Sequence, residues 1–563
     1  MISTKKNAQY LAAILLERGV HDIVFSPGSR NAPLIQICSA NKNFRCLNIV
    51  DERCAAFFAL GMALHRQKPV AIACTSGSAA LNYAPAISEA YYQKVPLLVL
   101  TADRPEEWVD QGDGQTIRQR NIYGNYIKHS CHLPEHMETD DDAWFAGRIV
   151  NEVLNALMYP EMGPAHINIP FKEPLYEVTE ENLPQPKIMA LHQGEVSFPA
   201  GTMEAFARIW RSHPRRMILV GQMRHDPELN ALLTDIAADP SIIVLAENLA
   251  NLRGEKFQLT LEHALHLISA DYHTYRPDLL ITCGGAVISK KLKTFLRQRQ
   301  PSHHWHISPA AEPMDTFMAL TDIIPSRPAH FLREFKKYMT PSGCSYGEDW
   351  RKPAAAARER HSAYLRQCEF SDLKAFDLIF AHLPGNSVLH LSNSSPVRYA
   401  QFFRSESSLL YMSNRGTSGI DGVLSSAAGY AFLSSRINTV IVGDLAFFYD
   451  SNALWNRCLP PNLRIILINN GGGGIFRLID GPAGMDALEE HFEARHAMEG
   501  APLARAHGLE CFVAENETEL ITGLRKLYQD GRDKAAILEI RTPGRRNAEI
   551  YQQYFHYLKG QEK

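Results

Sequence analysis

Two short segments near residues 444 and 470 combine a carboxylate, two amides and a run of glycines. Asp444 ends an apolar run that begins at Thr439, while Asn469 and Asn470 end another that begins at Arg464 and are followed by four glycines. Carboxylate and amide oxygens suit Mg²⁺ or Mn²⁺, and glycines let the backbone approach an anion closely. The pattern predicts a metal and phosphate site. The alternative is that Asp444 caps a helix and the glycines form a flexible loop.

A second candidate is Glu52, which follows a β-rich run and opens an almost entirely apolar segment. A carboxyl group in such surroundings can be desolvated, which raises its pKa and favours a protonated or proton-sharing form. Glu52 is therefore a candidate for proton transfer. The alternative is a carboxylate at a helix start, stabilised by the helix dipole or paired with Arg53.

Several cationic and polar residues follow predicted strands or stand in glycine-rich segments. In open parallel sheets, ligands bind beyond the carboxyl ends of the strands. Arginine suits carboxylates there because its planar fork can bond both oxygens. Any one of these cations could be a solvated surface charge, but as a set they indicate an anionic ligand. The set comprises Ser29, Arg30, Arg104, Lys290, Lys291, Ser394, Arg398 and Arg415.

The elements that must position these residues alternate between short β-rich runs and periodic helical segments, which predicts an α/β fold with three doubly wound parallel sheets. We expect domains at 1–180, 200–340 and 355–563, with irregular stretches at 177–199 and 340–353. A crossover helix at about 451–458 would make the two strands of the metal segments neighbours. The predicted strands are 22–25, 46–50, 70–74, 97–101, 217–221, 242–246, 279–285, 305–308, 388–391, 439–442, 464–468 and 537–540.

The composition excludes several classes of protein. Of the 563 residues 45% are hydrophobic and 21% charged, which is typical of globular chains. The net charge of −3 gives no global field for nucleic acid or an anionic membrane. No apolar run approaches the ~20 residues that span a bilayer, so we expect a cytoplasmic protein without membrane insertion. The ten cysteines form no C-x-x-C pair, which argues against zinc and for reduced thiols.

The metal segments and the run from Asp51 to Phe58 together resemble the thiamine diphosphate enzymes, whose signature is Gly-Asp-Gly followed at a distance by Asn-Asn. The third signature position here is Leu445. The resemblance implies that Glu52 meets N1′ of the aminopyrimidine and that Asp444, Asn470 and the Gly472 carbonyl ligate Mg²⁺ or Mn²⁺. It implies cofactor contacts from Glu52, Ile420, Gly443, Asp444, Leu445, Asn470, Gly472 and Ile475.

Within that superfamily, the segments at 26–30, 101–105 and 414–422 resemble the 2-succinyl-5-enolpyruvyl-6-hydroxy-3-cyclohexene-1-carboxylate synthases of menaquinone biosynthesis. This implies decarboxylation of 2-oxoglutarate and 1,4-addition of the succinyl unit to isochorismate by a homodimer, with tetramers left open. Catalysis would involve Glu52, Arg30, Gln115, Arg398 and Arg415. Ser394, Arg398 and Arg415 would hold 2-oxoglutarate, with Ile475 and Phe476 lining the pocket. Ser29, Arg30, Arg104, Gln115, Lys290 and Lys291 would line the isochorismate side, and Ile420 would bend the cofactor.

Three departures from the family pattern stand out. The loop Gly112 to Gln115 contains Asp113, Ala446 replaces a common hydroxyl residue, and Lys291 replaces a common arginine. The main alternative function is another thiamine diphosphate-dependent 2-oxo acid decarboxylase or carboligase. A catalytically silent scaffold is disfavoured because Glu52 and Asp444 are present. A dinucleotide oxidoreductase is weaker still, because no G-x-G-x-x-G follows the first strand of any domain.

Overall fold

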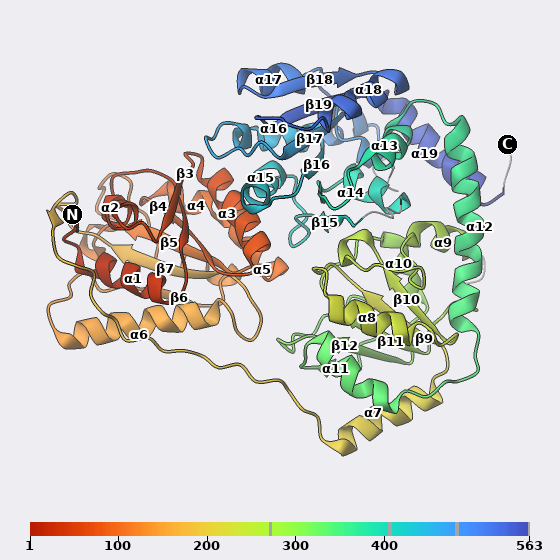
Figure 1. The fold of residues 1–563 in the computed structure, drawn as a ribbon, viewed down its shortest axis with the longest axis horizontal. Coiled ribbons are helices and arrows are strands. Elements are labelled where there is room, and N and C mark those ends of the chain that lie inside the picture. Colours follow the sequence, from red (N-terminus) through yellow and green to blue (C-terminus); the bar gives the residue numbers. More distant parts are fainter. Residues whose placement is uncertain (269–272, 404–407, 479–483, 561–563) are drawn as a thin grey trace.

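A computed structural model of the protein describes residues 1–268, 273–403, 408–478 and 484–560 and contains three parallel sheets that follow one another along the chain (Figure 1). The N-terminal sheet has the order β3-β2-β4-β5-β7-β6. Its strands are β2 (Asp22–Phe25), β3 (Arg45–Asn48), β4 (Val70–Cys74), β5 (Leu97–Asp103), β6 (Ser130–His132) and β7 (Ala165–Pro170). Its helices are α1 (Lys6–Glu17), α2 (Ala32–Ala40), α3 (Glu52–Arg66), α4 (Ser78–Asn82), α5 (Ala84–Gln93) and α6 (Asp140–Ala156).

A small antiparallel pair, β1 (Ile2–Ser3) with β8 (Val178–Thr179), closes this first unit. Residues 180–199 then run without helix or strand to the central sheet, as the irregular stretch predicted. That sheet has the order β10-β9-β11-β12-β13. Its strands are β9 (Arg216–Val220), β10 (Ile242–Ala246), β11 (Leu279–Cys283), β12 (His303–Ile307) and β13 (Asp322–Ile324). Its helices are α7 (Ala200–Ser212), α8 (Pro227–Ile236), α9 (Leu261–Ile268), α10 (Lys290–Gln298) and α11 (Pro328–Phe335).

The C-terminal sheet, β15-β14-β16-β17-β19-β18, repeats the strand order of the first. Its strands are β14 (Val388–Leu391), β15 (Leu410–Met412), β16 (Asn438–Gly443), β17 (Leu463–Asn469), β18 (Glu510–Ala514) and β19 (Ala536–Arg541). Its helices are α13 (Asp372–His382), α14 (Ser395–Tyr399), α15 (Val423–Leu433), α16 (Asp444–Tyr449), α17 (Gly500–Ala506), α18 (Glu517–Leu527) and α19 (Gly544–Leu558).

The second stretch expected to be irregular, 340–353, is partly wrong. Helix α12 (Tyr346–Gln367) begins inside it, carries Pro353 within the helix, and runs along one side of the molecule (Figure 1). Tyr346 and Trp350 are buried in the core of the central unit, while Tyr364 is buried in the core of the C-terminal one. Burying such large side chains offsets the cost of an interior proline. The domain start expected at 355 thus falls within a continuous helix.

The crossover between β16 and β17 also differs from expectation. The connecting helix is α16, which begins at Asp444 itself, and residues 451–454 form only a short 3₁₀ turn. The strands are nevertheless parallel neighbours, with Gly443 opposite Ile468. Because β16 passes directly into a helix, Asp444 lies at the sheet edge and at a helix N-terminus at once.

The N-terminal and C-terminal units meet through helices α3 and α15. Their backbones approach closely at Gly61 of α3 and Gly429 of α15. A β-carbon on Gly61, for example, would lie 2.0 Å from the carbonyl oxygen of Ser426. The core residues of both helices, including Phe57 and Ala428, belong to one continuous cluster. Among the helices of the described ranges, none combines the length and apolar character needed to traverse a bilayer.

Candidate active site

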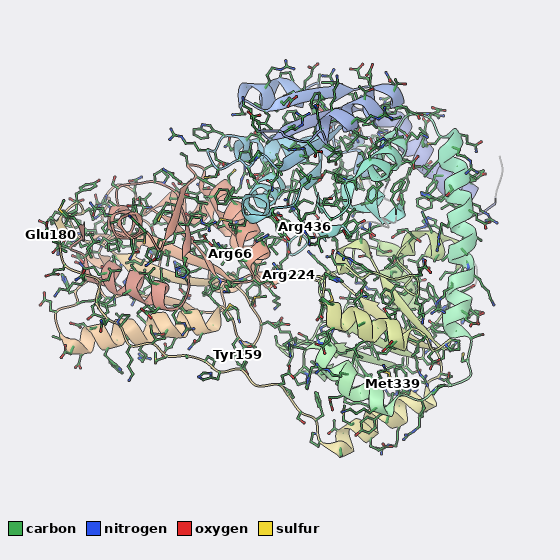
Figure 2. The ribbon with its side chains drawn as sticks, in the orientation of Figure 1. Arg66, Tyr159, Glu180, Arg224, Met339 and Arg436 are labelled. Atoms are coloured by element: carbon green, nitrogen blue, oxygen red, sulfur yellow. The ribbon has the colours of Figure 1, made fainter. Side chains whose placement is uncertain are left out.

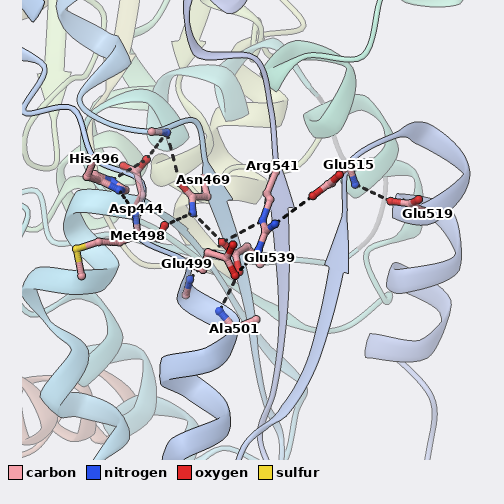
Figure 3. A network of polar contacts seen from close by, with 12 residues as sticks. Asp444, Asn469, His496, Met498, Glu499, Ala501, Glu515, Glu519, Glu539 and Arg541 are labelled. Atoms are coloured by element: carbon pink, nitrogen blue, oxygen red, sulfur yellow. Dashed lines mark hydrogen bonds and ion pairs between the residues drawn. The ribbon is translucent and has the colours of Figure 1, made fainter.

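The metal segment is organised around Asp444, which is 3% exposed. Its Oδ2 accepts the backbone N–H groups of Gly471 and Gly472, both at 2.9 Å, and its Oδ1 accepts that of Leu445 at 2.7 Å. Burial raises the pKa of this carboxyl group, against these hydrogen bonds, and Nε2 of His496 lies 3.4 Å from Oδ2 (Figure 3). The β16 and β17 ends therefore meet as the sequence predicted.

The two asparagines of this segment face different ways. Asn469 donates to the carbonyl of Met498 at 2.9 Å and to Glu539 Oε1 at 2.7 Å (Figure 3). Asn470 instead donates its Nδ2 to Oδ2 of Asp372 at 3.0 Å. Both amides lie near Asp444. Oδ1 of Asn469 accepts, at 3.4 Å, the same Gly471 N–H that donates to Asp444. Asn470 bonds Asp372, whose pKa is raised by burial and further by Asp444.

The donor set fits a hard divalent cation with a phosphate group. Each carboxylate oxygen has two acceptor sites, so the amides bonded to Asp444 leave lone pairs for a metal. The amide of Asn470 points its nitrogen at a carboxylate, so its oxygen is the end available for a cation. Gly471 and Gly472 have φ angles of 81° and 146°, and a β-carbon at Gly472 would lie 2.6 Å from the carbonyl oxygen of Glu493. Only glycine fits that position.

Glu52 is the first residue of α3, directly after β3, at the carboxyl edge of the N-terminal sheet. Asp51 caps the helix by accepting the N–H of Cys54 at 3.0 Å. Glu52 is half-buried and accepts from Nδ2 of Asn82 at 3.4 Å. Burial, with a contribution from Glu52, raises the pKa of the fully buried Cys74 thiol. The carboxylate thus lies at the rim of the apolar core.

The loop that carries Ile420 is held from below by Asn393. The Nδ2 group of Asn393 donates to the carbonyl of Asn414 at 2.7 Å and to that of Gly419 at 2.6 Å. Ile420 itself is 40% exposed, which is high for a large aliphatic side chain. A fixed backbone with an exposed apolar side chain suits contact with a ligand. Ile475, also predicted to contact the cofactor, is buried, and Phe476 packs against Phe492 with ring centroids 5.6 Å apart.

Two arginines predicted for the donor substrate come together. Arg415 donates from Nη1 to Oδ1 of Asn393 at 2.9 Å, and Arg398 from Nη1 to the carbonyl of Ser394 at 2.7 Å. Burial lowers the pKa of both guanidinium groups, and Arg398 lowers that of Arg415 further. Two mutually repelling, partly desolvated cations favour a bound dianion. Ser394 supports this geometry with a left-handed backbone, φ 74°.

Two residues of this cluster escaped the sequence analysis. Lys293 is half-buried, and burial lowers its pKa, opposed by Glu247 and reinforced by Arg415. Glu247 is 4% exposed and accepts the backbone N–H groups of Ile288 and Ser289 at 2.6 and 2.7 Å. Burial raises the pKa of Glu247 to about 7. Glu247 directly follows β10, so the rule about strand ends could have found it.

The two lysines predicted for the acceptor, Lys290 and Lys291, are more exposed than Lys293. Lys290 and Lys291 are exposed at the start of α10. Lys291 contacts the His266 ring and lies 5.4 Å from the ring centroid of Phe555, so it packs towards α9 and α19. The structure therefore brings Lys293, one turn further along α10, closest to the arginines.

The N-terminal cations gather at the carboxyl edge of the first sheet. Arg30 is buried, donates to the Phe171 carbonyl at 2.8 Å and pairs with Glu173 at 3.2 Å. Arg104 pairs with Asp113 at 2.7 Å and donates to the carbonyl of Gly114 at 2.9 Å. Burial and then Arg104 lower the pKa of Arg30, which shows that the two cations are close. Ser29 and Gln115 are exposed beside them.

The loop departure noted in the sequence has a structural role. Asp113, where the family pattern differs, holds Arg104. Gln115 has a left-handed backbone, φ 54°, and its backbone lies 3.2 Å from where a β-carbon on Gly77 would be. The loop is therefore fixed against the strand ends.

A cavity of about 530 Å³ opens where the three units meet. It is lined by Tyr92 and Lys94 from the first unit, Lys293 from the central one and Arg415 from the last. Arg66, Arg224 and Arg436 mark the same junction, one from each unit (Figure 2). Arg415, one of the two arginines predicted for the donor, is thus reached from an interdomain cavity.

Comparisons with known proteins agree with these features. The profile of the thiamine pyrophosphate enzyme, N-terminal TPP binding domain, matches residues 5–122. A 2-succinyl-5-enolpyruvyl-6-hydroxy-3-cyclohexene-1-carboxylate synthase of Porphyromonas gingivalis is 39% identical over 99% of this chain and 98% of its own. Synthases of the same name from Flavobacterium johnsoniae and Bacteroides thetaiotaomicron are 40% identical over 98% of both chains and 37% identical over 99% and 100%.

These relatives align over nearly their whole length and over all three sheets. The chain therefore belongs to the thiamine diphosphate-dependent 2-succinyl-5-enolpyruvyl-6-hydroxy-3-cyclohexene-1-carboxylate synthase family.

Proposed function

We propose that this enzyme decarboxylates 2-oxoglutarate and adds the remaining succinyl unit to isochorismate in a 1,4 fashion, releasing CO₂. The observation that carries the proposal is the pairing of Arg398 with Arg415 beside the Ile420 loop. Two adjacent guanidinium groups match the distal carboxylate of a dicarboxylic 2-oxo acid. A monocarboxylic substrate would offer this pair no second carboxylate.

Thiamine diphosphate, when bound, supplies the thiazolium carbon that adds to the 2-oxo group and accepts the electrons left by decarboxylation. Glu52 would hold a proton at N1′ of the aminopyrimidine. Its position at the rim of the core shields this carboxyl partly from water. Ile420 would support the bent cofactor from below through a loop that Asn393 fixes.

The residues that would hold Mg²⁺ or Mn²⁺ are Asp444, through Oδ1 or Oδ2, Asn470, through Oδ1, and Gly472, through its carbonyl; the ion would supply positive charge for the cofactor's diphosphate. Gly443 and Leu445 would flank the diphosphate, and Ile475 and Phe476 would cover the donor. Support comes from the tight Asp444–Gly472 geometry and from the orientation of Asn470.

For the acceptor we propose Ser29, Arg30, Arg104 and Gln115, with Lys290 and Lys291 at the rim. Burial and then Arg104 lower the pKa of Arg30, which supports a site where the two arginines together present two charges to a dicarboxylate. The guanidinium group of Arg30 is already bonded to Glu173, and that of Arg104 to Asp113. Binding of the acceptor therefore requires that each arginine exchange or share its carboxylate partner.

We further propose a homodimer in which Glu52 of one chain completes the diphosphate site of its partner, with pairing into tetramers left open; closed two-fold symmetry yields two equal sites. Mixing inactive Glu52→Gln and Asp444→Ala chains should restore some activity if subunits exchange. Full activity in a verified monomer would contradict this arrangement.

All ten cysteines are free, which fits a reducing compartment such as the cytoplasm.

The deciding experiment follows isochorismate consumption by ultraviolet absorbance with 2-oxoglutarate, thiamine diphosphate and Mg²⁺. We expect consumption that depends on all three. Release of CO₂ from 2-oxoglutarate with aldehyde acceptors, but no consumption of isochorismate, would favour a carboligase with another acceptor.

A further inference from the structure

The side chain of Asn470 can serve a cation in only one of its two orientations. An amide has an oxygen that accepts and ligates, and a nitrogen that only donates. The two ends have nearly the same shape, so packing alone does not distinguish them. A ligand amide therefore needs a neighbour that tells its ends apart.

That neighbour is Asp372, the first residue of α13, which is 2% exposed. Its Oδ2 accepts from Nδ2 of Asn470 at 3.0 Å, and its Oδ1 accepts from the hydroxyl of Thr542 at 2.6 Å. The Asp372 backbone N–H donates to Oδ1 of Asn547 at 2.9 Å, which fixes the backbone at the start of α13.

In the hydrogen-bond network around Asp372, each donor and acceptor role is fixed. Asn547 donates its Nδ2 to Oγ1 of Thr542 at 3.1 Å, so the Thr542 hydroxyl proton is directed to Asp372. A carboxylate accepts only, and a buried carboxylate beside an amide oxygen would leave both acceptors without a proton. Asn470 must therefore turn its nitrogen to Asp372 and its oxygen away.

We infer that Asp372 is a positioning residue, which fixes the amide oxygen of Asn470 towards the metal without touching metal or cofactor. The inference rests on the metal assignment proposed above. Outer groups that orient a metal ligand commonly alter metal affinity 10- to 100-fold when changed. The sequence gives little signal for this residue, because Asp372 stands at the start of the helix before the first strand of the sheet and not at a strand end.

The first test is Asp372→Asn, which can present either an oxygen or a nitrogen to Asn470. We expect Mg²⁺-dependent binding of thiamine diphosphate, measured by quenching of tryptophan fluorescence, to weaken by about tenfold or more. The matched control is Asp377→Asn on the same helix, whose carboxylate lies 3.7 Å from Lys374. It should bind as the unchanged protein does.

The second test exchanges the two groups in the variant Asp372→Asn with Asn470→Asp. A carboxylate at 470 offers oxygen in both orientations, so it needs no neighbour to orient it. We expect the double variant to recover affinity to within about threefold of the unchanged protein, whereas damage to the fold would not be rescued. Thermal unfolding without ligands reports that damage separately.

The outcomes separate the two hypotheses. If Asn470→Ala leaves Mg²⁺-dependent binding unchanged, the metal assignment is wrong. If Asn470→Ala weakens binding while Asp372→Asn does not, the assignment stands and the positioning role is refuted. If both Asp372→Asn and the double variant bind equally poorly and unfold at a lower temperature, Asp372 is structural and the inference is overturned.

Discussion

A β-carbon on Gly429 would lie 1.9 Å from the carbonyl oxygen of Phe58, so helices α15 and α3 are in backbone contact at this point. The contact joins the unit that carries Glu52 to the unit that carries Asp444. No side chain can be inserted there without moving one helix away from the other.

Gly429→Ala should therefore destabilise the protein. Overpacking in a core typically costs ~1–3 kcal/mol, and here the obstacle is backbone, which cannot change rotamer. Chemical denaturation would measure the free energy of unfolding. The control is Gly147→Ala in α6, a buried helical glycine whose β-carbon would meet no atom within 4 Å. Equal stability of the two variants would show that the helices adjust freely.

Asp444→Ala should abolish retention of thiamine diphosphate while leaving the sheet intact. The variant loses the proposed metal ligand and also frees the N–H groups of Gly471 and Gly472. Circular dichroism checks the fold, and fluorescence of the released cofactor after gel filtration measures retention. Tight binding of the cofactor with Mg²⁺ in this variant would refute the metal site.

Glu52→Gln should still bind the cofactor and turn over slowly. Glutamine keeps the volume and the contact with Asn82 but lacks an exchangeable carboxyl proton. General acid–base groups typically contribute roughly 10²–10⁴-fold in rate. Steady-state kcat at saturating substrates and the cofactor Kd should therefore separate. Near-normal turnover would assign cofactor activation to a different group.

Arg415→Ala should raise the KM for 2-oxoglutarate strongly and that for isochorismate slightly, while Arg104→Ala should do the reverse. A hydrogen bond to a charged group is worth about 1.5–3 kcal/mol, which corresponds to roughly 10- to 150-fold. Pre-steady-state decarboxylation without isochorismate isolates the donor step. If Arg104→Ala slows that step as much as Arg415→Ala does, the two arginines do not serve separate substrates and the assignment to two pockets is wrong.

Affinity for the donor should fall as the pH rises through about 7. Burial raises the pKa of Glu247 to about 7, so this carboxyl is neutral at lower pH and becomes an anion beside Arg415 and Lys293 at higher pH. The new charge offsets the cations that bind the dianionic donor. The KM for 2-oxoglutarate should rise several-fold between pH 6 and 8, and Glu247→Gln should flatten this profile.

The pH experiment includes variants of two further carboxylates, Glu262 and Glu228. The neighbouring Glu262 on α9 also has a pKa raised by burial and could add to the slope, so Glu262→Gln is measured in parallel. Glu228→Gln on α8, an exposed site paired with Arg333, serves as the control that should change nothing. An unchanged profile in Glu247→Gln would remove Glu247 from the donor site.

The sequence predicted the buried central strands well, because runs such as Leu97–Asp103 are apolar on both faces. It missed β7, whose His166 and Asn168 look unlike a core strand. These side chains are satisfied by Thr101, at 2.7 Å each, a pairing that only the folded sheet creates. Short edge strands such as β15 contain too few residues for an alternation of apolar and polar side chains to be recognised.

The same limit applies to the site. The sequence predicts that Asp444 and Asn470 lie at the same sheet edge because each follows a strand, and the parallel pairing of β16 with β17 agrees with this placement. The sequence does not single out Lys293 because α10 presents three lysines in little more than one turn, and only packing selects among them. The neighbour of Asn470, Asp372, lies 98 residues away in the chain, a pairing that no local pattern contains.

The position of α12 has a consequence for synthesis of the chain. Each sheet is built from one continuous segment, so each can form as it leaves the ribosome. The central sheet has its last strand at Ile324, yet its core still lacks Tyr346 and Trp350, which arrive only with α12. A nascent or truncated chain ending between these points exposes an uncovered apolar face. While residues 325–350 are being translated, the core of the central sheet is therefore still incomplete.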